Sequence, residues 1–258
     1  MSTHLPLKQI DVVQTAPKRP SQKDLPTMYD LPSEDPNERC LPDEFHSYQP
    51  QLLRKTFFPS NSPSYRVLIS SDLNLYYNAD SYKRQNWMAV VGVSRFYQKR
   101  DLRTDYIIWQ EEVLPFIVFE LLSPSSQKED LGKTLRDFKE PPSKWEVYER
   151  ILGIPYYVVY SRKLDYFRAF RLVAERYEEL IIPEKRLWIP EISLGLGISS
   201  GAYQDIERDW LRWYDAKGKW IATPEERIEE GIQRAEKEKQ RAEQLAAQLR
   251  ALGIEPNV

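Results

Sequence analysis

The stretch PFIVFELLSPSS, Pro115 to Ser126, decides the fold of this sequence. Seven of its first eight residues are of types that suit a protein core, and the eighth is Glu120. A short apolar run bounded by turn residues indicates a strand that is buried on both faces. An ionised carboxylate in such a strand costs several kcal/mol unless it is paired or bound to a cation. Glu120 therefore reaches solvent at the strand end, pairs with an arginine, or binds a metal ion.

The segments that follow this strand predict how the chain continues. Lys144 to Leu152 has a helical pattern and stops at Gly153, a residue type that commonly ends helices. A second apolar run, Tyr156 to Ser161, comes next. A strand, a helix and another buried strand in this order indicate parallel pairing through a right-handed crossover. We therefore expect an α/β (α+β) fold with a mixed sheet flanked by helices. Further strands are predicted at Tyr65–Ser70, Trp87–Val93, Tyr106–Trp109 and Tyr166–Leu172, with shorter pieces near Leu180 and Trp188.

Composition excludes several classes of function. The chain has 258 residues, 41% of them hydrophobic, and a net charge of −2, so it can form a core but has no global attraction to nucleic acid. Its apolar runs are too short to cross a membrane. One cysteine, Cys40, and two histidines, His4 and His46, argue against disulfides and His/Cys metal sites. These features predict a cytoplasmic protein.

The chain divides into three predicted parts. Residues 1–38 are rich in proline, serine and charge and are expected to form a flexible arm. Residues 39–222 are expected to form the main domain, which begins with a helix from Leu41 to about Phe57 and ends in a β-hairpin over LRWYDAKGKWIA. Residues 223–253 are expected to form one long charged helix.

That last helix has clear start signals. Thr223 suits the N-cap, Pro224 the first helical position, and Glu226 completes a capping box. The heptad positions are too rich in alanine and lysine for a strong zipper. The helix therefore either mediates weak homodimerisation or partner docking, or stays solvated. These heptad positions are Ile228, Ile232, Ala235, Lys239, Ala242, Ala246 and Leu249.

Two constellations accompany Glu120. Lys144 and Tyr148 are four residues apart and so share one face of the predicted helix. Gln85 and Asn86 form a polar pair at the mouth of the strand that begins at Trp87. With ELLSPSS, the DLG of Asp130 to Gly132, KWEVY and GIPYYVVYS, this pattern resembles the PD-(D/E)XK nuclease superfamily, and more closely the bacterial putative restriction endonuclease family. The resemblance covers roughly residues 41–196.

The resemblance implies Mg²⁺- or Mn²⁺-dependent hydrolysis of DNA phosphodiesters. By position, Glu120 corresponds to the metal-binding glutamate and Lys144 to a lysine displaced from the strand to the next helix, where it orients water. Ser123, rather than a lysine, then follows the glutamate. Lys133 is a rival for the lysine role, and Asp130 either supports the site or caps a helix. Hard oxygen ligands of this kind suit Mg²⁺.

The sequence departs from the family pattern at one position. Asn86 stands where the family has a metal-binding aspartate, and it brings an oxygen but no charge. A neighbouring carboxylate, Asp72, Asp80 or Asp105, can replace it, or Glu120 with substrate phosphate suffices at a reduced rate. The sequence thus supports two hypotheses: a nuclease with a weakened site, or a catalytically degenerate scaffold acting as a DNA- or protein-binding adaptor. Arg95, with the nearby cluster Lys99, Arg100 and Arg103, either contacts phosphate or simply forms a polar hairpin tip.

Overall fold

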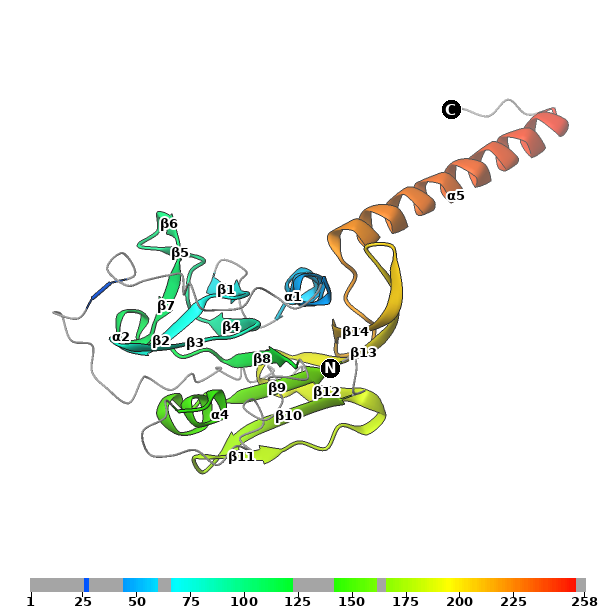
Figure 1. The fold of residues 1–258 in the computed structure, drawn as a ribbon. Coiled ribbons are helices and arrows are strands. Elements are labelled where there is room, and N and C mark those ends of the chain that lie inside the picture. The colour runs from blue at the N-terminus through cyan, green and yellow to red at the C-terminus, as the bar shows by residue number, and fades with distance from the viewer. Residues whose placement is uncertain (1–25, 28–43, 60–65, 123–141, 162–165, 254–258) are drawn as a thin grey trace, which may run out of the picture. The chain divides into compact units, whose positions relative to one another are not determined.

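The largest sheet in the protein is mixed, as the sequence predicts (Figure 1). The computed structural model describes residues 26–27, 44–59, 66–122, 142–161 and 166–253. Six strands pair in the order β1-β4-β8-β9-β10-β11, and within this sheet only β8 and β9 run parallel. The predicted parallel pairing and the α/β class are confirmed. The strands are β1 Val67–Ser70, β4 Trp87–Val91, β8 Ile117–Leu121, β9 Tyr156–Ser161, β10 Tyr166–Val173 and β11 Arg176–Glu179.

Three smaller sheets accompany the six-stranded sheet. Their orders are β3-β2-β7, β5-β6 and β12-β13-β14. Within them, only β2 and β7 pair in parallel. Their strands are β2 Asn74–Asn78, β3 Ser81–Arg84, β5 Phe96–Tyr97, β6 Asp101–Leu102, β7 Asp105–Ile107, β12 Arg186–Ile189, β13 Leu194–Tyr203 and β14 Ile206–Tyr214.

The helices are short except for the last one. The predicted helix at 144–152 is present, but after its first residues it continues as a π-helix and ends at Gly153 in the left-handed conformation, φ 70°. Helix α1 contains Pro50 in its interior. The described helices are α1 Phe45–Thr56, α2 Ile108–Glu111, α4 Lys144–Glu146, η2 Val147–Leu152, η3 Pro183–Lys185, η4 Pro190–Ile192 and α5 Pro224–Ala251.

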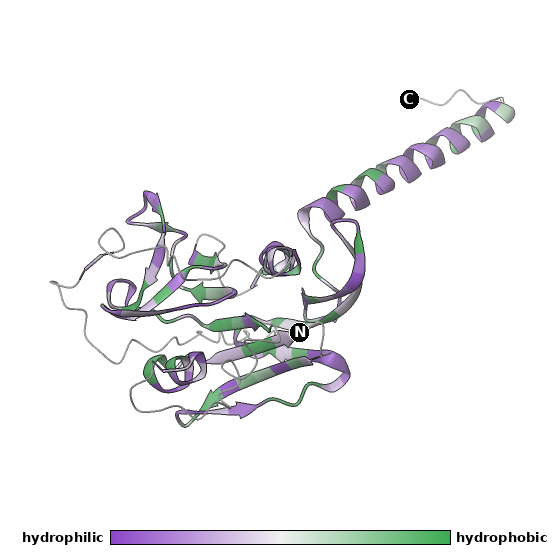
Figure 2. Ribbon diagram, in the orientation of Figure 1, coloured by the Kyte–Doolittle hydropathy of each residue, from purple (hydrophilic) through white to green (hydrophobic). Residues whose placement is uncertain are grey.

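The six-stranded sheet is buried on both faces, which explains the continuous apolar runs of β4, β8 and β9. On one face, α4 and η2 cover a core that includes Val118, Tyr148 and Tyr157. On the other face, aromatic rings interlock, and the ring centroids of Trp87 and Phe119 are 4.8 Å apart. Phe57, just after α1, and Trp213 of β14 join this aromatic cluster. Figure 2 shows β8 largely in the hydrophobic colour.

Several strands differ from the sequence prediction. The predicted strand Tyr106–Trp109 ends at Ile107 because α2 begins at Ile108. The sequence does not predict strand β13, because glycine and serine have low strand propensity; the strand is formed by nine residue pairs with β14. Gly195 is required there, since a Cβ would lie 1.9 Å from Cζ of Tyr214.

The hairpin predicted over LRWYDAKGKWIA is only partly present. The turn exists, with the Gly218 N–H donating to the Asp215 carbonyl at 2.9 Å. The second arm, however, forms a single bridge between Tyr214 and Trp220. The main partner of the first arm is β13, because β14 is already paired along its whole length.

The chain divides into two compact units, residues 1–220 and 221–258. The second contains α5, which starts at the predicted capping box: Glu226 N–H donates to Thr223 Oγ1 at 3.2 Å, and Thr223 N–H donates to Glu226 Oε2 at 2.7 Å. Helix α5 is mostly hydrophilic (Figure 2), and Ile228 and Ile232 are exposed. Its association with another helix stays a prediction. Among the described residues, no helix is both long and apolar enough to cross a membrane.

The aromatic cluster provides a test of the packing. Trp213 is fully buried against Phe57, Trp87 and Phe119. We expect Trp213→Ala to lower the free energy of unfolding by about 3–5 kcal/mol, because it removes a large ring and leaves a cavity. Trp188, which is 40% exposed, is the matched control, and its replacement by alanine should cost about 1 kcal/mol or less. Urea denaturation measures both; equal losses would contradict this prediction.

Candidate active site

Glu120 lies inside β8, between β4 and β9, with 1% of its side chain exposed. Strand alternation places it on the same face as Val118, which packs under the helix of α4 and η2. The strand is buried because both neighbours pair with it. The carboxylate therefore needs partners from the elements that cover this face.

Lys144 is the first of these partners. Its Nζ lies 2.7 Å from Oε2 of Glu120, and its side chain is 22% exposed. The helix begins at Lys144 because Ser143 forms a capping box with Glu146: Glu146 N–H donates to Ser143 Oγ, and Ser143 N–H donates to Glu146 Oε2. The ammonium group thus connects a buried carboxylate with solvent.

Tyr148 is the second partner. Its hydroxyl donates to Oε1 of Glu120 at 3.0 Å, and the side chain is fully buried. Lys144 and Tyr148 share a helix face, as their spacing predicts. Tyr148 belongs to the π-helical segment η2, a kind of structure that occurs frequently at functional sites. Both carboxylate oxygens are therefore engaged, and the partners are a lysine and a tyrosine rather than solvent or an arginine.

Asn86 lies next to Glu120 across the sheet. The strand register pairs Trp87 with Phe119, so one further step sets Asn86 opposite Glu120. Strand β4 starts only at Trp87, which leaves the backbone of Leu121 without a strand partner on that side. Asn86 Oδ1 accepts the Leu121 N–H at 2.7 Å, and His46 Nε2 lies 3.3 Å from the Leu121 carbonyl. Two side chains thus replace the missing ladder bonds.

This arrangement limits what Asn86 can offer to a metal ion. Its single side-chain oxygen already accepts a backbone N–H, and its amide nitrogen is a donor that cannot bind a cation. An aspartate would have a second oxygen and a negative charge. Asn86 therefore retains the structural part of the position, while the charge that would attract a divalent cation is lost.

Three aspartates are the expected replacements, and the structure separates them. Asp105 is buried and accepts the Asn74 side-chain N–H at 2.9 Å in the sheet of β2, β3 and β7. Asp80 is exposed in the turn between β2 and β3. Asp72 is different: its backbone N–H donates to the carbonyl of Gln85, the neighbour of Asn86, at 3.1 Å. Of these three aspartates, Asp72 is the one whose backbone is bonded next to Asn86.

Other predicted site residues lie outside the described residues. These are Ser123, Asp130 and Lys133. Their expected roles stay predictions, and so does the choice between Lys133 and Lys144 as the catalytic lysine. The structure does bring Lys144 to Glu120, whereas a lysine pointing away would have favoured Lys133.

Sequence reasoning missed three contributors to the site. The SKWE motif of Ser143 to Glu146 is a capping-box pattern that predicts a helix start at Lys144. Tyr148 is placed on the correct face by its spacing, but nothing in the sequence indicates its bond to Glu120. His46 has no signal at all, because it lies 75 residues from Leu121 in the chain.

The side chains around Glu120 offer few oxygens to a divalent ion. In the described ranges, no group of three or more His, Cys, Asp or Glu side chains is arranged to hold a metal. Mg²⁺ is often held by one or two protein carboxylates together with substrate phosphates and water. Glu120 meets that minimum only when an ion displaces Lys144 or Tyr148 from one of its oxygens. The residues present therefore fit a weak site that substrate would have to complete.

Most of the chain matches a known protein family. Residues 37–202, well over half of the chain, match a family model described as "Uma2: Putative restriction endonuclease". The matched range includes Asn86, Glu120 and Lys144. No curated protein matches the chain.

The Glu120–Lys144 pair makes a testable stability prediction. Lys144→Met should lower the free energy of unfolding by about 3 kcal/mol, because it leaves a buried carboxylate without its cation. The double variant Glu120→Leu/Lys144→Met should recover most of this loss, since a buried ion pair is often no more stable than apolar residues of similar volume. Thermal and urea denaturation measure both. A double variant no more stable than Lys144→Met would show that the pair is needed for stability itself.

Proposed function

The chain belongs to the Uma2 family of putative restriction endonucleases, and from this membership we propose that it is a metal-dependent DNA endonuclease with a weakened metal site. The observation that carries the proposal is the buried Glu120 carboxylate, which is held by Lys144 at the end of β8. A buried ion pair contributes little net stability. Its presence beneath a partly exposed lysine is better explained by chemistry than by folding.

In this proposal, Glu120 holds Mg²⁺ or Mn²⁺ together with oxygens of the DNA phosphate. A bound divalent ion supplies Lewis-acid stabilisation of the phosphate and activates water. Tyr148 keeps the carboxylate oriented through its bond to Oε1. Lys144, which reaches solvent, orients the attacking water and stabilises negative charge that develops on the phosphate.

Asn86 weakens the site because one anionic ligand is lost. We propose that Asp72 supplies part of the missing charge. Its backbone is bonded to Gln85 beside Asn86, whereas Asp105 is bonded to Asn74 in a different sheet and Asp80 lies in an exposed turn. A single cysteine and DNA as the substrate agree with action in the cytoplasm.

A second candidate function is favoured by a specific observation. Both oxygens of Glu120 and the oxygen of Asn86 already accept hydrogen bonds from protein donors. A scaffold that had lost catalysis would keep such bonds, because they satisfy buried polar groups. The protein would then act as a DNA- or protein-binding adaptor.

Cleavage of plasmid DNA tests the nuclease proposal. Purified protein with Mg²⁺ or Mn²⁺ should nick supercoiled DNA slowly, and Asn86→Asp should raise the rate at least about tenfold by restoring an anionic ligand. Glu120→Gln should abolish nicking, whereas Glu207→Gln, an exposed residue of β14, should not change it. Nicking that survives Glu120→Gln would remove Glu120 from the site. DNA binding without cleavage in wild type and in Asn86→Asp would favour the adaptor.

The role of Asp72 has a separate test. Asp72→Asn should lower the wild-type nicking rate at saturating Mn²⁺ and raise the Mn²⁺ concentration needed for half-maximal rate, because it removes charge near the ion. Asp80→Asn is the matched control, since Asp80 is exposed in the β2–β3 turn. Equal metal dependence in the wild type and in Asp72→Asn would exclude Asp72 as the replacement.

A further inference from the structure

The β5–β6 hairpin is a short, well-defined projection. Phe96 pairs with Leu102, and Tyr97 pairs with Asp101. The turn residues Gln98 and Lys99 both have positive φ, 48° and 64°, and Arg100 N–H donates to the Tyr97 carbonyl at 3.0 Å. Turns with two positive φ values match the twist of paired strands. The hairpin therefore has one defined geometry despite its short strands.

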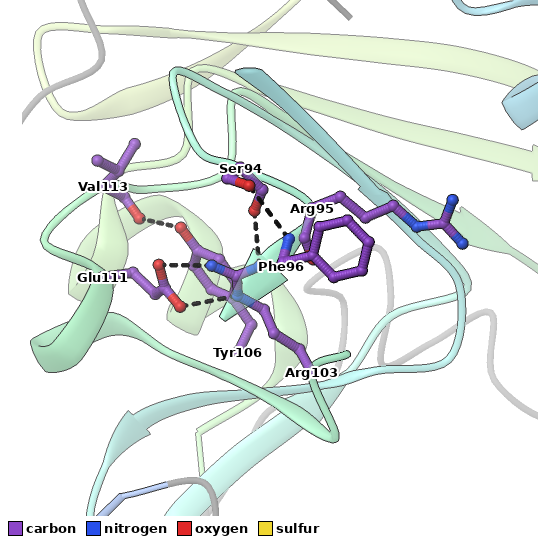
Figure 3. Close-up of polar contacts among 7 residues, drawn as sticks. All are labelled: Ser94, Arg95, Phe96, Arg103, Tyr106, Glu111 and Val113. Carbon is purple, nitrogen blue, oxygen red and sulfur yellow. Dashed lines mark hydrogen bonds and ion pairs between the residues drawn. The ribbon is translucent and has the colours of Figure 1, made fainter. Parts of the chain in front are cut away.

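Arg103 fixes the base of this hairpin (Figure 3). Its Nη1 donates to the carbonyls of Ser94 and Arg95, at 2.6 and 2.8 Å, and its Nε and Nη2 donate to the carboxylate of Glu111 in α2. The Arg103 side chain is only 4% exposed. Of the basic cluster considered in the sequence, Arg103 is therefore a structural residue that anchors the hairpin.

The rest of the hairpin faces solvent. Phe96 and Leu102 are 44% and 60% exposed, and as cross-strand partners they lie on the same face. Arg95, Lys99 and Arg100 are also exposed. An exposed apolar pair flanked by cations is costly to keep on a surface without a function. Proteins that bend DNA insert apolar side chains of this kind between base steps.

A second basic residue reaches Arg95 from a different element. Partial burial and the nearby Arg95 guanidinium lower the pKa of Arg54 in α1. In the described part of the chain, neither guanidinium has a hydrogen bond or an ion pair. Two guanidiniums held close together repel each other, and an anion between them removes the repulsion. Phosphate suits such a pair because guanidinium groups bind its oxygens in a bidentate manner.

Helix α1 also links this basic pair to the candidate active site. His46 of α1 contacts the carbonyl of Leu121, which follows Glu120. Arg54 lies eight residues further along the helix, a rise of about 12 Å. That length corresponds to roughly three to four base-pair steps of duplex DNA. One duplex can therefore reach both places.

We propose that the β5–β6 hairpin and Arg54 form a grip for duplex DNA, in which Arg54 and Arg95 hold a backbone phosphate and Phe96 with Leu102 enters the minor groove as an apolar wedge. Lys99 and Arg100 at the tip contact flanking phosphates. The grip rests on the proposed function in that DNA is the partner, but it concerns binding and needs no metal ion.

Binding of a short fluorescent DNA duplex in EDTA, followed by anisotropy at several salt concentrations, tests the grip. Arg54→Gln with Arg95→Gln should weaken binding and lower the slope of log K against log salt by about 0.9 for each phosphate that is no longer neutralised. Phe96→Ser with Leu102→Ser should weaken binding roughly tenfold at each salt concentration. The charge-matched control, Arg234→Gln with Arg241→Gln in α5, should bind like the wild type.

The outcomes of this experiment separate the grip from the nuclease proposal. Wild-type affinity in both hairpin variants, or no DNA binding by the wild type, would overturn the grip, whatever the nicking assay shows. If Phe96→Ser with Leu102→Ser changes the oligomeric mass in light scattering and leaves DNA affinity unchanged, the apolar pair is a protein contact and the wedge assignment is wrong. Unchanged melting temperatures confirm that the variants are folded. Loss of nicking in Glu120→Gln with normal DNA binding would support both proposals.

Discussion

A carboxylate buried within a sheet needs a cation, and the bond between Glu120 and Lys144 meets that need. The surrounding structure is arranged around this contact. Parallel pairing of β8 with β9 requires a crossover, and the crossover contains α4 and η2, which place Lys144 and Tyr148 over β8. The capping box at Ser143 sets where the helix starts, so it also sets which residue faces the carboxylate.

Asn86 shows that one position can serve structure and chemistry separately. Strand β4 begins too late to pair with Leu121, so a side-chain oxygen at position 86 has to accept the Leu121 N–H. Asparagine and aspartate both provide that oxygen. Only aspartate also provides a negative charge. Replacement by asparagine therefore leaves the sheet intact and changes only the affinity for a cation, which is how a nuclease family member can keep its fold with a weakened site.

The two faces of the six-stranded sheet have different roles. The face with Trp87, Phe119 and Trp213 is closely packed aromatic core, whereas the opposite face contains the buried polar contacts of Glu120. A similar division holds among the arginines near β5 and β6. Arg103 is paired and buried, and it fixes the hairpin, while Arg95 and Arg54 lie near each other without an acidic partner in the described part of the chain. A cation that is fully paired stabilises the fold, and one that is not is available to bind phosphate.

The sequence by itself determined the elements with strong local signals: the apolar strands β4, β8 and β9, the end of η2 at Gly153 and the start of α5 at Thr223. It also identified Glu120 as unusual, because a charge within an apolar run is visible without coordinates. It did not reveal β13, whose glycines form a strand only through pairing with β14. Only the tertiary structure decided that Tyr148 and Lys144 share the carboxylate, that Asn86 and His46 complete the backbone of Leu121, and that Asp72 rather than Asp105 lies beside them. Those contacts join residues far apart in the chain, and their geometry follows from strand register and helix packing, which local sequence patterns do not encode.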